Sequence, residues 1–160
     1  IVRSMPNTPA LIGAGITGLC ALPEVDAAGR AAAERVLRAV GSTVWIDDEA
    51  RMDAVTAISG SGPAYVFLFI EALQLAAADL GFTPEQGRQL AIGTVQGAAT
   101  LAAQASEPAS VLRERVTSAG GTTEAALRTM AERGVKEGII AGVMAAERRG
   151  RELGTILGAD

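Results

Sequence analysis

Residues 64–80 read AYVFLFIEALQLAAADL, and this stretch decides the fold. It is apolar nearly all round, because only Glu71, Gln74 and Asp79 interrupt it. A helix without a clear polar face is a buried helix. Such a helix is more easily buried inside a dimer than inside one chain of 160 residues, so the sequence predicts that a second copy completes the core.

Small side chains make up much of the rest of the chain. Alanine occurs 32 times and glycine 19 times, whereas aromatic residues number five. Helices with small-residue faces pack by close approach of their backbones. The composition therefore predicts one domain of closely packed helices rather than a core of bulky side chains.

Composition also excludes several kinds of chemistry. The chain has no histidine, which rules out Ser-His-Asp triads, Cys-His pairs and His-based proton shuttles. Its single cysteine, Cys20, rules out thiolate zinc sites and intrachain disulfides, is expected to be a packing residue, and favours a reducing compartment. We expect no metal site. A net charge of −4 with few aromatic residues argues against nucleic-acid binding.

Signals along the chain predict an all-α domain with a short β element near its start. Residues 1–22, which contain several prolines and glycines, are expected to be extended or irregular. A short strand is expected at residues 42–46, after Gly41 at the C-cap position of the preceding helix. Asp47-Asp48-Glu49 are expected to be charges at a helix start, and Thr83-Pro84-Glu85-Gln86 a capping box. Gly81 and Gly134 are expected to end the helices before them, and a sharp break is expected at Ser59-Gly60-Ser61-Gly62-Pro63. The expected helices cover about residues 24–40, 50–59, 64–80, 84–105, 108–116, 123–133 and 136–153, before a frayed tail at 154–160.

No signal peptide or membrane span is expected. The longest uncharged runs are residues 54–70 and 89–106; the first contains the predicted break and the second carries five Gln or Thr residues. The chain begins with Ile rather than Met, in apolar residues that lead directly into a motif. We therefore expect residue 1 to be a cut point within a longer protein.

Three segments have a more specific choice of residues than a turn needs, and the first is Ser118-Ala119-Gly120-Gly121-Thr122-Thr123. Two glycines with flanking hydroxyls before a helix start form an anion cradle of free backbone N–H groups, a helix dipole and hydroxyl donors. The lysine of a phosphate-binding P-loop is absent, so a carboxylate fits better than a nucleotide phosphate. A glycine-rich turn with a Thr N-cap explains the same residues and stays open.

The other two segments are Met5-Pro6-Asn7-Thr8-Pro9 and Gly60-Ser61-Gly62-Pro63-Ala64-Tyr65. Two prolines around an Asn-Thr pair fix an extended backbone that can hold the edge of a ligand, or form an ordinary rigid linker. The glycines of the second segment suit a helix junction that needs close backbone approach. Pattern alone favours the structural interpretation of each segment.

Together, the three segments resemble the pyrroline-5-carboxylate reductase family, which catalyses the last step of proline biosynthesis. The resemblance is carried by residues 116–123 with Ala126-Leu127, by residues 5–10 and by residues 59–65, in the family's order. It extends from residue 1 to about residue 153. Ala119 stands where the family commonly has proline, so we expect a less preorganised loop.

The resemblance implies a fold and a domain organisation. The family joins an N-terminal Rossmann domain, which holds NADH or NADPH, to a helical dimerisation domain of the 6-phosphogluconate-dehydrogenase C-terminal type. This chain resembles the second domain. Residues 1–8 would be the end of the nucleotide-binding domain or a linker, residues 9–153 the dimerisation and substrate-loop domain, and residues 154–160 a tail.

A dinucleotide site is not expected in this chain. Residues 13–18, Gly-Ala-Gly-Ile-Thr-Gly, have the dinucleotide spacing but lack a strand-turn-helix context. The chain alone is therefore expected to bind the cofactor poorly and to lack reductase activity.

The resemblance also implies roles in the reduction of 1-pyrroline-5-carboxylate to L-proline. Thr123 would lie near the ring nitrogen as the catalytic residue, where it hydrogen-bonds the nitrogen or relays a proton. Asn7 would lie near the nicotinamide end of the cofactor. A cytoplasmic homodimer, or a higher oligomer, is implied. The substrate carboxylate would be held by Ser118 and by the backbone at Gly120, Gly121, Thr122 and Thr123.

Two alternatives stay open. The chain could be the helical domain of another two-domain imine or hydroxyacid reductase. Many of these place a catalytic lysine on a domain helix, but the only lysine here, Lys136, lies beyond the loop. A helical homodimerisation module without a catalytic role would explain the alanine-rich helices, but it would leave the Ser118–Thr123 loop without a purpose.

Overall fold

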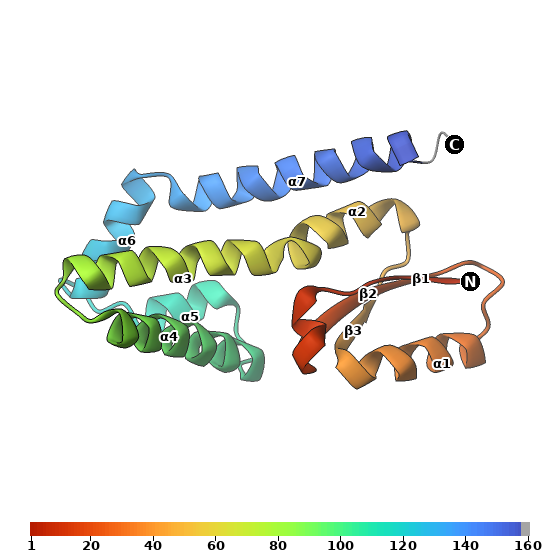
Figure 1. The fold of residues 1–160 in the computed structure, drawn as a ribbon, viewed down its shortest axis with the longest axis horizontal. Coiled ribbons are helices and arrows are strands. Elements are labelled where there is room, and N and C mark those ends of the chain that lie inside the picture. The colour runs from red at the N-terminus through yellow and green to blue at the C-terminus, as the bar shows by residue number, and fades with distance from the viewer. Residues whose placement is uncertain (158–160) are drawn as a thin grey trace. The chain divides into compact units, whose positions relative to one another are not determined.

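The computed structural model describes residues 1–157, which form two compact units. Unit 1 comprises Ile1–Tyr65 together with the described residues from Ile140 onward, and unit 2 comprises Val66–Ile139. Helices α3 and α7 each have residues in both units. Figure 1 labels the helices and strands along the chain. The elements are β1 (Val2–Met5), β2 (Gly15–Ala21), α1 (Ala27–Leu37), β3 (Gly41–Trp45), α2 (Met52–Val55), α3 (Gly62–Asp79), α4 (Pro84–Gln104), α5 (Ala109–Arg115), α6 (Thr122–Glu132) and α7 (Val135–Leu157).

A three-stranded sheet in the order β1-β2-β3 organises unit 1. Strand β2 pairs antiparallel with β1 and parallel with β3, and α1 connects the two parallel strands. Residues 1–22 are largely extended, as predicted, but they form two paired strands, β1 and β2, that the sequence analysis did not assign. Pro9 lies in the short 3₁₀ helix Thr8–Ile12 between the strands, Gly15 begins β2, and Gly18 lies in the middle of β2.

The core of unit 1 is built on both faces of the middle strand, which contacts both α1 and α2. Thr17, Leu19 and Cys20 of β2 are buried, as is Met52 at the start of α2. The free thiol of Cys20 is thus enclosed in the core, which confirms that it is a packing residue. Strand β2 is central because partners on both sides satisfy its backbone.

Gly41 allows the two parallel strands to start side by side. Its φ of 148° lies in a region that L side chains rarely adopt. A Cβ atom there would lie 2.0 Å from the carbonyl oxygen of Gly15, its partner across the ladder. Helix α1 ends at Leu37, and a 3₁₀ turn at Arg38–Val40 continues it up to Gly41. Gly41 is the C-cap of this turn, as predicted, and also the first residue of β3.

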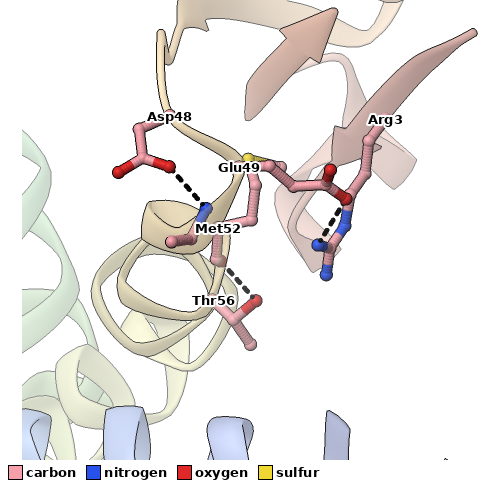
Figure 2. Close-up of polar contacts among 6 residues, drawn as sticks. Arg3, Asp48, Glu49, Met52 and Thr56 are labelled. Carbon is pink, nitrogen blue, oxygen red and sulfur yellow. Dashed lines mark hydrogen bonds and ion pairs between the residues drawn. The ribbon is translucent and has the colours of Figure 1, made fainter. Parts of the chain in front are cut away.

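Polar contacts fix where the helical region begins after β3. The Asp48 carboxylate accepts a hydrogen bond of 2.9 Å from the backbone N–H of Ala50, and Glu49 pairs with Arg3 of β1 at 3.2 Å (Figure 2). Asp48 acts as an N-cap for a short 3₁₀ turn that leads into α2. This confirms the prediction that the acidic residues here are helix-start charges.

The predicted sharp break at Ser59–Pro63 was wrong. The backbone passes through a π turn at Thr56–Gly60, and Ser61 keeps right-handed helical angles before α3 begins at Gly62. Pro63 occupies the first turn of α3, where its missing N–H is harmless. Residues 49–79 are thus helical almost throughout, with a widened turn in place of the break.

The helices of unit 2 follow their sequence signals closely. Thr83 and Gln86 form the predicted capping box at the start of α4. Small residues mediate the contact between α3 and α4, because a Cβ on Gly87 would lie 3.1 Å from the Cβ of Ala77. Helix α7 continues to Leu157, four residues past its predicted end, and residues 158–160 of the predicted tail lie outside the described residues.

The apolar helix α3 is not covered by its own chain. Phe67, Leu68 and Leu75 are each more than 60% exposed, with values of 64%, 66% and 63%. By length and composition alone, the helical stretch Glu49–Asp79 is also apolar enough to cross a membrane, because an 18-residue window within it has a mean hydropathy of 1.3. Helices that pack against another protein chain are apolar in the same way, so the composition of this helix fits a protein interface as well as a membrane.

A cluster around Glu34 ties α1 to β3. Its carboxylate accepts hydrogen bonds from the Trp45 indole at 3.4 Å, the Thr43 hydroxyl at 3.2 Å and the Arg38 guanidinium at 3.0 Å. The guanidinium of Arg30 lies 5.1 Å from the centre of the Trp45 ring. The hydrogen bonds from Trp45 and Thr43, with the charge of Arg38, hold the pKa of Glu34 below its usual value.

We predict that Glu34→Gln destabilises the chain at neutral pH. Because the pKa is lower in the folded state, the ionised carboxylate contributes stability above the pKa it has when unfolded. That contribution is lost as the pH falls through the folded-state value. Urea unfolding at pH 7 and near pH 3 should show a difference between wild type and variant that shrinks in acid.

Glu24→Gln is the matched control, because Glu24 is exposed and has no ion pair within residues 1–157. Its stability should follow that of the wild type at both pH values. A Glu34→Gln deficit that stays constant with pH would show that the ionisation of Glu34 does not matter.

Candidate functional site

The Ser118–Thr123 loop joins α5 to α6 within unit 2. The Thr117 hydroxyl closes the end of α5 by donating to the carbonyl of Arg113 at 2.6 Å. Gly120 then takes the left-handed conformation, with a φ of 71°, which turns the chain into α6. Gly121 is the N-cap of α6, so Thr122 and Thr123 are its first two helical residues.

Two backbone N–H groups of the loop are already used. The N–H of Gly121 donates to the carbonyl of Ser118 at 3.0 Å, and the N–H of Gly120 donates to the carboxylate of Glu124 at 2.5 Å. Both groups were among the predicted substrate donors. In this structure they hold the loop in shape.

The amides of the first turn of α6 remain available. No side chain caps this helix, and the N–H groups of Thr122, Thr123 and Glu124 have no acceptor within the described residues. A helix N-terminus carries about half a positive charge. Unpaired amides and this dipole together favour an anion at this end of α6.

Hydroxyl groups lie beside these amides. Ser118 is exposed and Thr123 is half-buried. A Cβ on Gly121 would lie 2.5 Å from the Ser118 hydroxyl oxygen, so the absence of a side chain at Gly121 lets this hydroxyl lie close to the backbone. The loop therefore presents amide and hydroxyl donors, with no basic side chain among its six residues.

Glu124 is the residue of this site that the sequence analysis missed. Its carboxylate is exposed and lies in the first turn of α6, where the helix dipole stabilises negative charge. The available signal was its position three residues after the N-cap, where Glu often reaches back to a free N–H group. An anion that binds the loop would compete with Glu124 for the N–H of Gly120.

Asn7 lies in unit 1 and both ends of its amide are engaged. Its Nδ2 donates to the carbonyl of Ser59 at 3.1 Å, and its Oδ1 accepts from the N–H of Ile16 at 3.0 Å. Met5 approaches the same turn, because a Cβ on Gly60 would lie 2.7 Å from the methyl carbon of Met5. Two of the three segments singled out in the sequence thus meet in unit 1.

The remaining candidates do not form a dinucleotide or metal site. Gly13 ends a 3₁₀ helix, and Gly15 and Gly18 lie on β2. No helix begins directly after these glycines, so the cradle of a dinucleotide fold is not formed there. Among residues 1–157, no group of three or more metal-ligating side chains is gathered. An open pocket of about 440 Å³ in unit 1 is lined by Ala50, Asp53, Arg151, Gly154 and Thr155.

Comparison with known proteins gives a consistent result. Residues 49–153 match the family model described as pyrroline-5-carboxylate reductase dimerisation. The chain is 45% identical over 158 residues to the pyrroline-5-carboxylate reductase of Pseudomonas aeruginosa, covering 99% of this chain and 58% of that protein. It is 43% identical to the Haemophilus influenzae enzyme of the same name, covering 98% of this chain and 58% of that protein.

Solved structures agree with this match. A pyrroline-5-carboxylate reductase from Coxiella burnetii has a TM-score of 0.92 and 45% identity, covering 96% of this chain and 57% of that one. A pyrroline carboxylate reductase from Plasmodium falciparum with NADP bound has a TM-score of 0.89 and 32% identity, covering 96% of this chain and 63% of that one. The chain thus spans less than two thirds of the length of these relatives.

Proposed function

Since this chain belongs to the pyrroline-5-carboxylate reductase family, we propose that it is the substrate-loop and dimerisation part of an enzyme that reduces 1-pyrroline-5-carboxylate to L-proline with NADPH or NADH. The observation that carries this proposal is the first turn of α6, with its uncapped amides beside the Ser118 and Thr123 hydroxyls. These groups suit a small carboxylate substrate.

The substrate carboxylate would bind to the N–H groups of Thr122 and Thr123 and to the Ser118 hydroxyl. Gly121 contributes through the backbone shape it permits, because its own N–H group is already paired with the carbonyl of Ser118. The N–H of Gly120 would become available to the substrate carboxylate when that carboxylate displaces Glu124. A hydrogen bond from a backbone N–H to a charged group contributes about 1.5–3 kcal/mol, roughly twice the contribution of a neutral hydrogen bond. Two amides and one hydroxyl therefore give useful affinity without a basic side chain.

Thr123 would act at the ring nitrogen. The cofactor supplies a hydride to the carbon of the C=N bond, and the nitrogen keeps or gains a proton as the imine becomes an amine. The Thr123 hydroxyl can hydrogen-bond the nitrogen or relay that proton. A reaction of this kind needs orientation more than a strong acid, which agrees with a chain that contains no histidine.

The dinucleotide would be held mainly by residues outside this chain. The glycines at 13–18 do not form a phosphate cradle, whereas the Plasmodium relative, which is longer, has NADP bound. This chain alone is therefore proposed to be inactive. Its single buried cysteine suits the reducing cytoplasm, which is the proposed compartment.

We predict activity in a chimera in which this chain replaces the matching 58% of the Pseudomonas aeruginosa enzyme. The chimera should oxidise NADPH or NADH only when 1-pyrroline-5-carboxylate is added, with L-proline as the product. This chain alone is the control and should give no oxidation. A folded chimera that leaves the substrate unreduced would contradict the proposed activity.

In the same chimera, we predict that Thr123→Ala lowers kcat by about 10²-fold, the lower end of what a positioned proton donor contributes. Thr123→Ser should recover most of the rate, because it keeps the hydroxyl. Thr129→Ala serves as the control, since Thr129 lies on the same helix and its hydroxyl bonds only the carbonyl of Ala125. An unchanged kcat in Thr123→Ala would remove Thr123 from the reaction.

The exposed face of α3 supports the proposal of a homodimer. Phe67, Leu68 and Leu75 lie on a helix that is matched by the family's dimerisation model. Burying each of these side chains would contribute about 1.5–3 kcal/mol. A second copy of the chain supplies an apolar surface of the same kind, so α3 is proposed to lie in the subunit interface.

We predict that Leu68→Glu converts the dimer to a monomer, because it places a charge where apolar surface would be buried. Light scattering should report the mass of two chains for the wild type and of one chain for the variant. Val36→Glu is the control: Val36 is 69% exposed on α1, outside the matched residues, and should leave the mass unchanged. A wild-type monomer would overturn the proposed interface.

A further inference from the structure

The π turn at Thr56–Gly60 is held by side chains from three places in unit 1. Its defining hydrogen bond runs from the N–H of Ser61 to the carbonyl of Thr56 at 2.8 Å, five residues earlier. A π turn shifts backbone carbonyls away from the amides they would meet in an α-helix, and such turns occur often at functional sites. The shifted carbonyls need other donors.

Three carbonyls of this region, those of residues 55, 57 and 59, accept side-chain hydrogen bonds. The Ser59 hydroxyl donates to the carbonyl of Val55 at 2.9 Å. The Tyr65 hydroxyl donates to the carbonyl of Ala57 at 3.2 Å, and Asn7 donates to the carbonyl of Ser59 at 3.1 Å. Figure 2 shows a further bond of this kind, from the Thr56 hydroxyl to the carbonyl of Met52, at 3.1 Å.

Asn7 and Tyr65 differ from the other donors because they reach the turn from outside it. Asn7 follows β1 and also accepts from the N–H of Ile16, so its amide links β1, the start of β2 and the π turn. Tyr65 reaches back to the turn from the first turn of α3. Both side chains are half-buried, which shields these bonds from competition with water.

We propose that Asn7 and Tyr65 are positioning residues that hold the π turn, and that Asn7 acts on the reaction through this turn rather than by binding the cofactor. This inference rests on the proposed function. The link to the reaction is α3, which starts at Gly62 directly after the turn and belongs to the family's dimerisation region, residues 49–153, which also contains the Ser118–Thr123 loop. It replaces the cofactor-binding role that the sequence resemblance implied for Asn7.

The two roles predict different consequences for Tyr65. If Asn7 binds the cofactor directly, removal of the Tyr65 hydroxyl should not reproduce the effect of Asn7→Ala. If Asn7 holds the turn, removing either donor leaves a carbonyl of the same turn unpaired. Asn7→Ala and Tyr65→Phe should then have the same effect, although the two residues are 58 positions apart.

The test uses the active chimera with Asn7→Ala, Asn7→Asp and Tyr65→Phe. Hydrogen exchange should show the protection of the Ser61 amide falling at least about tenfold in all three variants. Asn7→Asp keeps the acceptor for Ile16 and replaces the donor to Ser59 by a carboxylate oxygen, which repels the Ser59 carbonyl, so it breaks the bond to the turn while keeping the bond to Ile16. We expect kcat to fall in each variant, with KM for the dinucleotide within about twofold of the unsubstituted value.

Thr8→Ala is the control, because Thr8 is exposed, adjoins Asn7 and makes no side-chain hydrogen bond within the described residues. Unchanged protection of the Ser61 amide in Asn7→Ala would overturn the proposal. It would also be overturned if Asn7→Ala raised the KM for the dinucleotide while Tyr65→Phe left the kinetics and the Ser61 protection unchanged. An inactive unsubstituted chimera would refute the proposed function instead. In that case, the exchange measurements still decide whether Asn7 and Tyr65 hold the turn.

Discussion

The apolar helix α3 imposes the constraint on which the rest of the structure depends. Its side chains are too large and too apolar to stay in water, yet the chain contributes mainly small residues to cover them. Ala77 and Gly87 allow α4 to approach closely along one side, while Phe67 and Leu68 remain exposed. The hydrophobic effect therefore favours association of this helix with further apolar surface.

The same helix explains why the region before it is so heavily hydrogen-bonded. Helix α3 begins directly after a π turn, which is a weaker arrangement than an α-helix, and unit 1 compensates with side-chain donors. Asn7, Ser59 and Tyr65 each satisfy a different carbonyl. The Met5–Pro9 segment, which looked in the sequence like a rigid linker, therefore contacts the Gly60–Tyr65 segment, which looked like a glycine junction.

Local signals predicted the helices and the strand β3 well, but they did not identify β1 and β2. The capping box at Thr83 and the glycines after α3 and α6 fixed those helix boundaries, because such signals act within a few residues. Strand β2 is largely buried, and its parallel pairing with residues 41–45 joins segments that are far apart along the chain. The π turn could not be predicted for the same reason, because Asn7, which donates to the carbonyl of Ser59 in the turn, lies 52 residues earlier.

The loop illustrates how far residue types alone can indicate chemistry. Its glycines and hydroxyls favour a carboxylate cradle over a phosphate site, but they did not reveal that Glu124 already bonds to the N–H of Gly120. If the loop receives a substrate carboxylate as proposed, one carboxylate replaces another at a similar bond energy of about 1.5–3 kcal/mol. The displaced Glu124 side chain is exposed and returns to water. An internal carboxylate can therefore keep the loop ordered before the substrate arrives, which lowers the entropy that binding must overcome. The hydrogen bond from Gly120 to Glu124 therefore offsets the absence of proline at Ala119, because it orders the loop as a proline ring would.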